Sequence, residues 1–233
     1  MDNTIPERYE RSIGALNEQE IKALHEKNVC IIGCGGLGGY ILEMLARLGI
    51  LNITVVDGDV FSKSNLNRQI LCTEENISEY KAEAAVRRIK KINSEVHVRS
   101  YKVFITDENA AEILRGHDVI IDALDNVPSR LLLEKHAEEL GIPLIHGAIR
   151  GWFAQTAVIK PGDRLLYRLY QSAGSSRDAK KKSFTPAPPF TPVFCASLQV
   201  TQAVKLLLGK ETLAGGKLLM ADLSENSLNV FDI

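Results

Sequence analysis

A glycine-rich segment that directly follows a short apolar run constrains the fold of this chain more than any other feature. Residues 29–32 are continuously apolar, which is typical of a strand buried on both faces of a parallel sheet. The segment that follows matches the pattern G-x-G-x-x-G through Gly33, Gly35 and Gly38. Apolar residues then recur at helical spacing up to Gly49, and residues 53–56 form a second, mostly apolar run. This order predicts one βαβ unit with a right-handed crossover.

The rest of the chain extends this unit into a doubly wound α/β fold. Strand and helix patterns alternate to about residue 145, which predicts a mainly parallel, Rossmann-like sheet. From Phe153 onward, residues 157–159, 217–220 and 228–231 look like strands without crossover helices, so we expect them to be antiparallel. We expect a single domain over residues 1–233. Its parts are an N-terminal helix (1–27), a nucleotide-binding core (28–150), and C-terminal strands with a crossover loop (174–192) and a helix (196–208).

Composition excludes several classes of protein. The 28 basic and 29 acidic side chains give a net charge of −1, so no global field favours nucleic acid or an anionic membrane as partner. No apolar run approaches the roughly 20 residues that cross a bilayer, and the first residues lack a signal-peptide core. The four cysteines contain no C-x-x-C pair. We therefore expect a cytoplasmic protein with reduced thiols.

The glycine segment predicts a nucleotide site. Glycine lets the backbone approach a phosphate closely, and the helix that follows presents unpaired N–H groups and a partial positive charge. The expected contacts come from Gly33, Gly35, Gly36 and Gly38. Asp57, at the end of the second apolar run, can accept hydrogen bonds from both ribose hydroxyls. The alternative is that the glycines only permit packing of the helix against the sheet.

Charged side chains at later strand ends indicate which nucleotide binds. Arg68 follows the second strand, Lys81 opens the next helix, and Asp125 follows the strand at 119–122. In a doubly wound sheet these positions share the ligand-binding edge. Two cations and a carboxylate suit a triphosphate with its divalent metal, whereas a nicotinamide cofactor needs none of that charge. Taken singly, Lys81 could be a solvated helix residue, Arg68 a surface ion pair and Asp125 a helix N-cap.

A set of motifs in this order closely resembles the ThiF/MoeB/HesA adenylyltransferases, which are related to ubiquitin-activating enzymes. The motifs are residues 8–11, the glycine segment, Asp57, Ser64 to Gln69, Lys81, Asp122 to Asn126, and residues 197–199. The resemblance implies an enzyme that uses ATP and Mg²⁺ to adenylate the C-terminal glycine of a small ubiquitin-like sulfur-carrier protein ending in Gly-Gly.

The resemblance also implies roles for individual residues. Arg68 and Lys81 would bind the phosphates and Asp125 would ligate Mg²⁺, while Arg11 would reach the γ-phosphate from the partner subunit of a homodimer. Asn65 and Asn126 would contact the nucleotide. The attacking carboxylate is already ionised near neutral pH, so no general base is required. We therefore interpret the five histidines as structural.

The chain departs from the family pattern in two respects. Many relatives bind a structural zinc through two C-x-x-C pairs; here Leu166 and Leu169 occupy the first pair, so we expect no zinc. The crossover loop carries Lys180-Lys181-Lys182 but no thiol, and the nearest thiol is Cys195, directly before the predicted helix. A helix N-terminus can lower a thiol pKa, so a nucleophilic Cys195 stays open beside a buried, structural one.

Two alternative functions remain at this point. One is an NAD-dependent oxidoreductase that uses the same glycine segment; the charged residues argue against it. The other is a non-catalytic carrier-binding subunit. The sequence does not distinguish among thiamine, molybdenum cofactor, cysteine, methionine and peptide-modification pathways.

Overall fold

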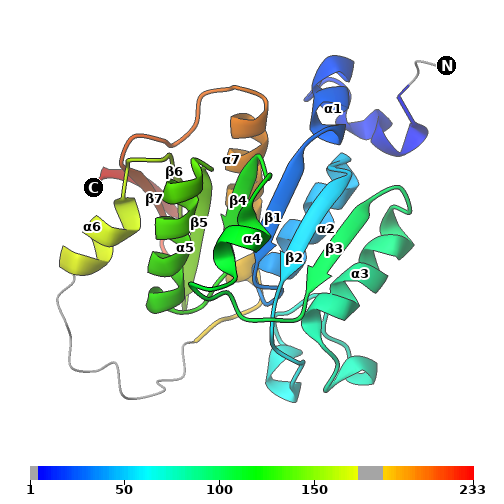
Figure 1. Cartoon of the computed structure of the whole chain (residues 1–233), viewed down its shortest axis with the longest axis horizontal. Helices are drawn as coiled ribbons and strands as arrows, with labels where there is room; N and C mark the ends of the chain where they lie inside the picture. Colours follow the sequence, from blue (N-terminus) through cyan, green and yellow to red (C-terminus); the bar gives the residue numbers. More distant parts are fainter. Residues whose placement is uncertain (1–4, 173–185) are drawn as a thin grey trace.

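The computed structural model describes residues 5–172 and 186–233 and contains a single eight-stranded sheet in the order β3-β2-β1-β4-β5-β6-β7-β8 (Figure 1). The strands are β1 (Asn28–Ile32), β2 (Asn52–Val56), β3 (His97–Tyr101), β4 (Val119–Asp122), β5 (Leu144–Arg150), β6 (Phe153–Ile159), β7 (Lys217–Asp222) and β8 (Ser227–Asp232). The helices are α1 (Glu18–His25), α2 (Gly38–Leu48), α3 (Lys81–Ile92), α4 (Ala110–Leu114), α5 (Val127–Leu140), α6 (Leu165–Ser172) and α7 (Phe190–Leu207). Short 3₁₀ helices are η1 (Glu7–Ser12), η2 (Lys63–Asn65) and η3 (Glu74–Asn76).

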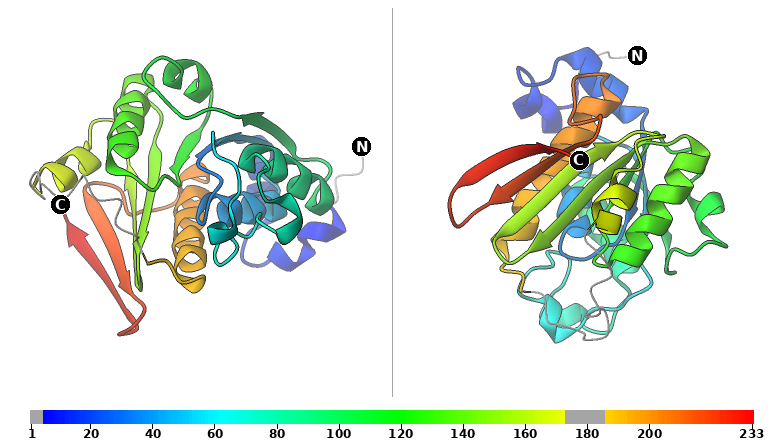
Figure 2. Two further views of the ribbon diagram at one scale, coloured as in Figure 1. Left: turned by 90° about the horizontal axis from the view of Figure 1, so that it is seen from below. Right: turned by 90° about the vertical axis from the view of Figure 1, so that its left-hand side faces the viewer.

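The sheet confirms the predicted fold class. Strands β1 to β5 are mutually parallel, whereas β6, β7 and β8 pair antiparallel with their neighbours. The last two strands form a hairpin that projects from one edge of the molecule (Figure 2). Among the described residues, no helix combines the length and the apolar character that a membrane span requires.

The helices differ from the sequence prediction in three places. The region predicted as an N-terminal helix over 1–27 holds two separate elements, η1 and α1, and α1 covers only Glu18–His25. Helix α7 begins at Phe190 rather than at Ala196, because Pro192 occupies its first turn, where a missing N–H costs no hydrogen bond. Helix α6 occupies residues 165–172, where we predicted no helix. The predicted loop at 174–192 therefore ends earlier than expected, and residues 173–185, including Lys180 to Lys182, lie outside the described residues.

The sheet is covered on both faces, which explains its continuously apolar strands. Successive side chains of a strand point to opposite faces. Val29 and Ile31 accordingly pack in the core beneath α2, α3 and α7, while Cys30 and Ile32 pack in a second core beneath α4, α5 and α6. Helices α2 and α7 lie side by side on the first face (Figure 2).

The connections place a crevice at the carboxyl ends of β1 and β4. These strands are neighbours, but α2 leaves β1 onto one face and α5 leaves β4 onto the other. Ligands of doubly wound folds bind where consecutive connections diverge in this way. The fold therefore positions the glycine segment and the segment after β4 at the same opening.

Candidate active site

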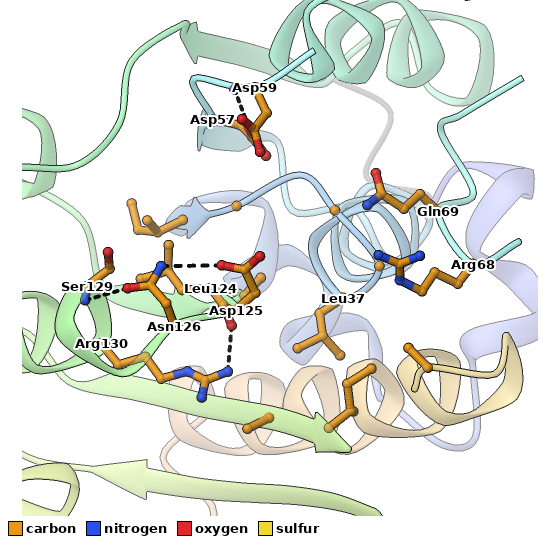
Figure 3. Close-up of a pocket in the computed structure, with 18 of the residues that line it drawn as sticks. Leu37, Asp57, Asp59, Arg68, Gln69, Leu124, Asp125, Asn126, Ser129 and Arg130 are labelled. Atoms are coloured by element: carbon orange, nitrogen blue, oxygen red, sulfur yellow. Dashed lines mark hydrogen bonds between the residues drawn. The ribbon is translucent and has the colours of Figure 1, made fainter. Parts of the chain in front are cut away.

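A cavity of about 1270 Å³ opens at the carboxyl ends of the parallel strands and extends across to β6 and β7. It brings together most of the predicted site residues, which are Gly33, Gly35, Gly36, Asp57, Arg68, Lys81, Asp125 and Asn126. Figure 3 shows Asp57, Arg68 and Asp125 projecting from three different segments toward the same space. Residues far apart in the sequence thus form one site.

The glycines of this segment serve two purposes: some allow close packing of the backbone, and others line the cavity. Gly33 has a φ of +102°, and a Cβ there would lie 2.6 Å from the carbonyl oxygen of Ala123, so close packing against the segment after β4 requires glycine. Gly38 does not line the cavity, and it starts α2 in contact with Gly33. Gly35 and Gly36 line the cavity and leave their backbone open to a ligand.

Asp57 is anchored to the glycine segment. Its Oδ2 accepts a hydrogen bond from the backbone N–H of Cys34 at 2.7 Å, and its Oδ1 accepts one from the N–H of Asp59 at 2.8 Å. Burial raises the pKa of Asp57, although nearby Lys81 and the two N–H donors oppose this shift. Each carboxylate oxygen can accept more than one hydrogen bond, so the group remains able to bind ribose hydroxyls.

The two predicted cations differ in their surroundings. Lys81 is buried, and its Nζ lies 3.0 Å from Oδ2 of Asp59, so the alternative of a solvated helix residue is wrong. Arg68 donates from Nη1 to the carbonyl of Ser64 at 2.9 Å and to Oδ1 of Asn67 at 2.8 Å. Within the part of the chain that the structure describes, no carboxylate pairs with Arg68. The two hydrogen bonds hold the guanidinium in place, and no described carboxylate neutralises its charge, so it can bind an anion.

The segment after β4 exposes a carboxylate to the cavity. Asn126, not Asp125, caps α5: its Oδ1 accepts a hydrogen bond from the N–H of Ser129 at 2.9 Å. Asn126 also donates from Nδ2 to Oδ1 of Asp125 at 3.3 Å. Both contacts are drawn in Figure 3. The carboxylate of Asp125 is therefore free for a ligand instead of satisfying the helix end.

Asn65 and Arg11, like Gly38, lie outside this cavity. Asn65 is buried in η2, and its Oδ1 accepts a hydrogen bond from the backbone N–H of Ser62 at 2.9 Å, which shapes the turn that leads to Arg68. Arg11 is exposed in η1, which packs against α2 near the amino ends of the strands, at the opposite edge of the sheet (Figure 1). Arg11 does not reach the cavity of its own chain.

Several residues of the site gave no signal in the sequence. Arg130 is buried in α5, with Nη2 donating to the carbonyl of Leu124 at 2.6 Å and Nε 3.5 Å from Oδ2 of Asp122. Gln155 lines the cavity from β6. A lone polar residue inside a helix or strand pattern looks the same whether it faces solvent or a pocket, so only the fold reveals such residues.

The structure corrects the argument for a reactive Cys195. The thiol lies inside α7 rather than before it, and it is fully buried, with Sγ 3.4 Å from the carbonyl oxygen of Gln155. Burial raises its pKa to about 12. A helix N-terminus therefore does not activate this thiol, and the structural interpretation is the one that fits.

The two positions where many relatives have the first zinc-binding cysteine pair are part of the hydrophobic core in this chain. Leu166 is buried, and Leu169 packs against the same core under α5 and α6. Among residues 5–172 and 186–233, no three histidine, cysteine, aspartate or glutamate side chains cluster as a metal site would require. The expected absence of zinc remains a prediction.

The chain matches known proteins along nearly its whole length. The model of the ThiF family matches residues 9–233. The chain is 32% identical to the SAMP-activating enzyme E1 of Haloferax volcanii over 95% of this chain and 83% of that protein. It is 34% identical to the sulfur carrier protein adenylyltransferase of Thermus thermophilus over 95% of this chain and 84% of that protein. A crystal structure of E. coli MccB with succinimide shares the fold, with a TM-score of 0.83 at 20% identity over 98% of this chain and 72% of that chain.

The doubly wound sheet, the glycine segment and the charged cavity suit a bound nucleotide, and the similarity to an adenylyltransferase over most of both chains makes this protein an ATP-dependent adenylyltransferase. The chain belongs to the ThiF family. The oxidoreductase alternative is therefore wrong.

Proposed function

We propose that this enzyme adenylates the C-terminal glycine carboxylate of a small ubiquitin-like sulfur carrier that ends in Gly-Gly, and that it uses ATP with Mg²⁺. The two relatives described above are named for SAMP activation and for a sulfur carrier protein. The observation that carries the proposal is that two cations share one cavity with the carboxylate of Asp57, which is placed to bind a ribose. Arg68 has no carboxylate partner among the described residues, and Lys81 is buried beside Asp59.

The proposed reaction forms one bond and breaks another. A carboxylate oxygen of the carrier attacks the α-phosphorus of ATP, the bond to the β-phosphate oxygen breaks, and pyrophosphate leaves with that electron pair. Attack by an anion on a polyphosphate is slow chiefly because both are negative, so neutralisation by fixed cations and alignment of the two groups supply most of the acceleration. Arg68 and Lys81 provide that positive charge.

The nucleotide would lie along the glycine segment. Asp57 accepts hydrogen bonds from the ribose hydroxyls, and the open backbone of Gly35 and Gly36 faces the phosphates. Asn126 lines the cavity beside Asp125, within reach of the same ligand. Asn65 acts indirectly, because its backbone carbonyl accepts a hydrogen bond from the N–H of Arg68 at 3.1 Å and so fixes the start of that side chain.

The residues present fit a magnesium ion. Mg²⁺ is usually held by one or two carboxylates together with substrate phosphates and water, and it does not need a cage of protein ligands. Asp125 offers an exposed carboxylate on the cavity wall, bonded only to the amide of Asn126 among the described residues. When bound, the ion would neutralise phosphate charge. We propose Asp125 as its protein ligand.

We also propose a homodimer in which Arg11 of one subunit completes the site of the other. Arg11 lies too far from its own cavity to reach a phosphate there. Complementation tests this arrangement: Arg11→Ala and Arg68→Ala variants should each lose most of their activity, and mixing them should restore part of it, because one site of the mixed dimer keeps both arginines. If activity stays absent after exchange of subunits is shown by native mass spectrometry, the trans role is wrong.

Carrier-dependent exchange of radiolabelled pyrophosphate into ATP tests the function itself. A panel of small carriers ending in Gly-Gly serves as substrate, and removal of the last glycine should abolish exchange. Asp125→Asn should raise the Mg²⁺ concentration needed for half-maximal exchange, while the matched surface variant Asp232→Asn should not. Exchange with no member of the panel would favour the non-catalytic carrier-binding subunit. The cytoplasmic location stays a prediction.

A further inference from the structure

Three side chains on neighbouring strands form a hydrogen-bonded chain that runs from the core to the cavity. Oδ2 of Asp122, at the end of β4, lies 2.7 Å from Nδ1 of His146 on β5. Nε2 of His146 lies 3.0 Å from Nε2 of Gln155 on β6. Asp122 and His146 are fully buried, whereas Gln155 lines the cavity wall.

The direction of each hydrogen bond follows from the charges around Asp122. Its Oδ1 accepts a hydrogen bond from the N–H of Leu124 at 2.9 Å, and the guanidinium of Arg130 lies 3.5 Å from its Oδ2, so both carboxylate oxygens face donors and act as acceptors. Nδ1 of His146 must therefore carry the proton. Burial lowers the pKa of His146 in spite of Asp122, which keeps the ring neutral and leaves a lone pair on Nε2.

This tautomer determines which end of the Gln155 amide faces the cavity. A neutral Nε2 of His146 can only accept, so Gln155 donates from its Nε2, and its carbonyl oxygen Oε1 is directed elsewhere. Within residues 5–172 and 186–233, no group donates to this oxygen. The cavity wall thus presents one hydrogen-bond acceptor with a defined orientation.

The position of Gln155 indicates what meets this acceptor. Its strand is the fourth from β2, so at ~4.8 Å per strand it lies about 19 Å from the strand that ends just before Asp57. That distance places it beyond the ribose, on the side of the cavity bounded by β6 and β7. The carrier's peptide has to approach the α-phosphate from a part of the cavity that the nucleotide leaves open.

We infer that Gln155 is a specificity residue that accepts a hydrogen bond from the backbone N–H of the carrier's terminal glycine, and that His146 and Asp122 are positioning residues for its amide. This inference rests on the proposed function. The terminal N–H is the donor nearest to the reacting carboxylate, so a hydrogen bond to it aligns that carboxylate for attack. The acceptor also disfavours a tail that lacks this N–H.

A semisynthetic carrier tests the inference. The terminal glycine is replaced by N-methylglycine, which keeps the carboxylate and removes the N–H. The enzyme should lose about 10-fold in kcat/KM for pyrophosphate exchange with the methylated carrier, as expected for one hydrogen bond. In Gln155→Leu the two carriers should differ far less, because the acceptor is absent while the bulk of the methyl group is unchanged. Equal loss in both enzymes overturns the inference.

Testing the role of His146 requires a measurement that does not change if the substitution lowers the stability of the folded enzyme. The ratio of kcat/KM between the two carriers is independent of the fraction of folded enzyme. His146→Leu should reduce this ratio toward that of Gln155→Leu and raise KM for the carrier but not for ATP, whereas His97→Leu on exposed β3 should keep the full ratio. An unchanged ratio in His146→Leu overturns the positioning role. Absence of exchange with the unmodified carrier in the parent enzyme would instead overturn the proposed function.

Discussion

A Cβ atom on Gly38 would lie 1.8 Å from the backbone carbonyl oxygen of Gly33. This distance is far below van der Waals contact, and the carbonyl oxygen belongs to the backbone, so no rotamer change relieves the clash. The two glycines bring the first turn of α2 against the end of β1, which is how the helix comes to face the ligand. Gly36, between them, differs: a Cβ there would lie 3.5 Å from its nearest neighbour, a Pro192 side-chain atom.

Gly38→Ala should therefore destabilise the fold, and Gly36→Ala should not. We expect a loss of about 3 kcal/mol or more in the free energy of unfolding for Gly38→Ala, because the added methyl group forces α2 away from the strand. Gly36→Ala should cost less than about 1 kcal/mol and weaken ATP binding instead. Urea unfolding followed by circular dichroism, with ATP titration of the folded variants, measures both. Equal stability of the two variants would contradict this packing argument.

Arg68→Ala should reduce kcat of pyrophosphate exchange by about 100-fold, the usual effect of removing one donor that stabilises a transition-state charge. Arg68→Lys should recover part of this loss, because the charge remains but the two-pronged hydrogen bonding does not. Arg115→Ala, at the opposite edge of the sheet, is the matched control and should leave exchange unchanged. Full activity in Arg68→Ala would remove the phosphate role.

Cys195→Ala should keep pyrophosphate exchange, since adenylation requires no thiol and this one is buried with a pKa raised to about 12. The thiolate is the reactive form, so Cys195 in the folded enzyme should resist iodoacetamide at pH 8 and react after unfolding in urea. Peptide mass spectrometry at both conditions measures the modification. Rapid alkylation of the folded enzyme, or loss of exchange in a folded Cys195→Ala variant, would show that the thiol takes part.

Acidification should destabilise the protein in part through His117. Its Nδ1 lies 2.9 Å from the carbonyl of Leu114 and its Nε2 2.8 Å from the hydroxyl of Thr54, contacts that suit the neutral ring. Burial, aided by Arg99, lowers the pKa of His117 in the folded state below its ordinary value near 6.5. The unfolded state therefore binds the proton first, and stability is lost as the pH falls through 6.5 toward the folded pKa.

Urea unfolding between pH 7.5 and 5 checks this prediction. The free energy of unfolding should fall with decreasing pH, and the slope should be smaller in His117→Gln. The slope should not vanish, because burial also lowers the pKa of His25 and His146. His97→Gln on exposed β3 is the control and should keep the full slope. An identical slope in His117→Gln would show that its protonation is not linked to folding.

Local patterns were sufficient to predict the architecture and most of the residues that gather around the cavity. Buried strands, helical spacing and glycine positions depend on neighbours in the chain, so the βαβ order and the antiparallel C-terminal strands could be predicted. The convergence of Asp57, Arg68, Lys81 and Asp125 on one cavity could be predicted because the carboxyl ends of parallel strands share one edge of the sheet.

Contacts between residues far apart in the sequence determined the features that the sequence analysis missed. Whether Cys195 begins a helix or lies inside one depended on where α7 starts, and its pKa depended on the strands that bury it. Gln155 and His146 are ordinary strand residues in the sequence, and only the pairing of β5 with β6 places them in one hydrogen-bonded chain. Hydrogen-bond direction and desolvation are set by groups that the sequence separates, so they emerge only when the tertiary structure brings those groups into contact.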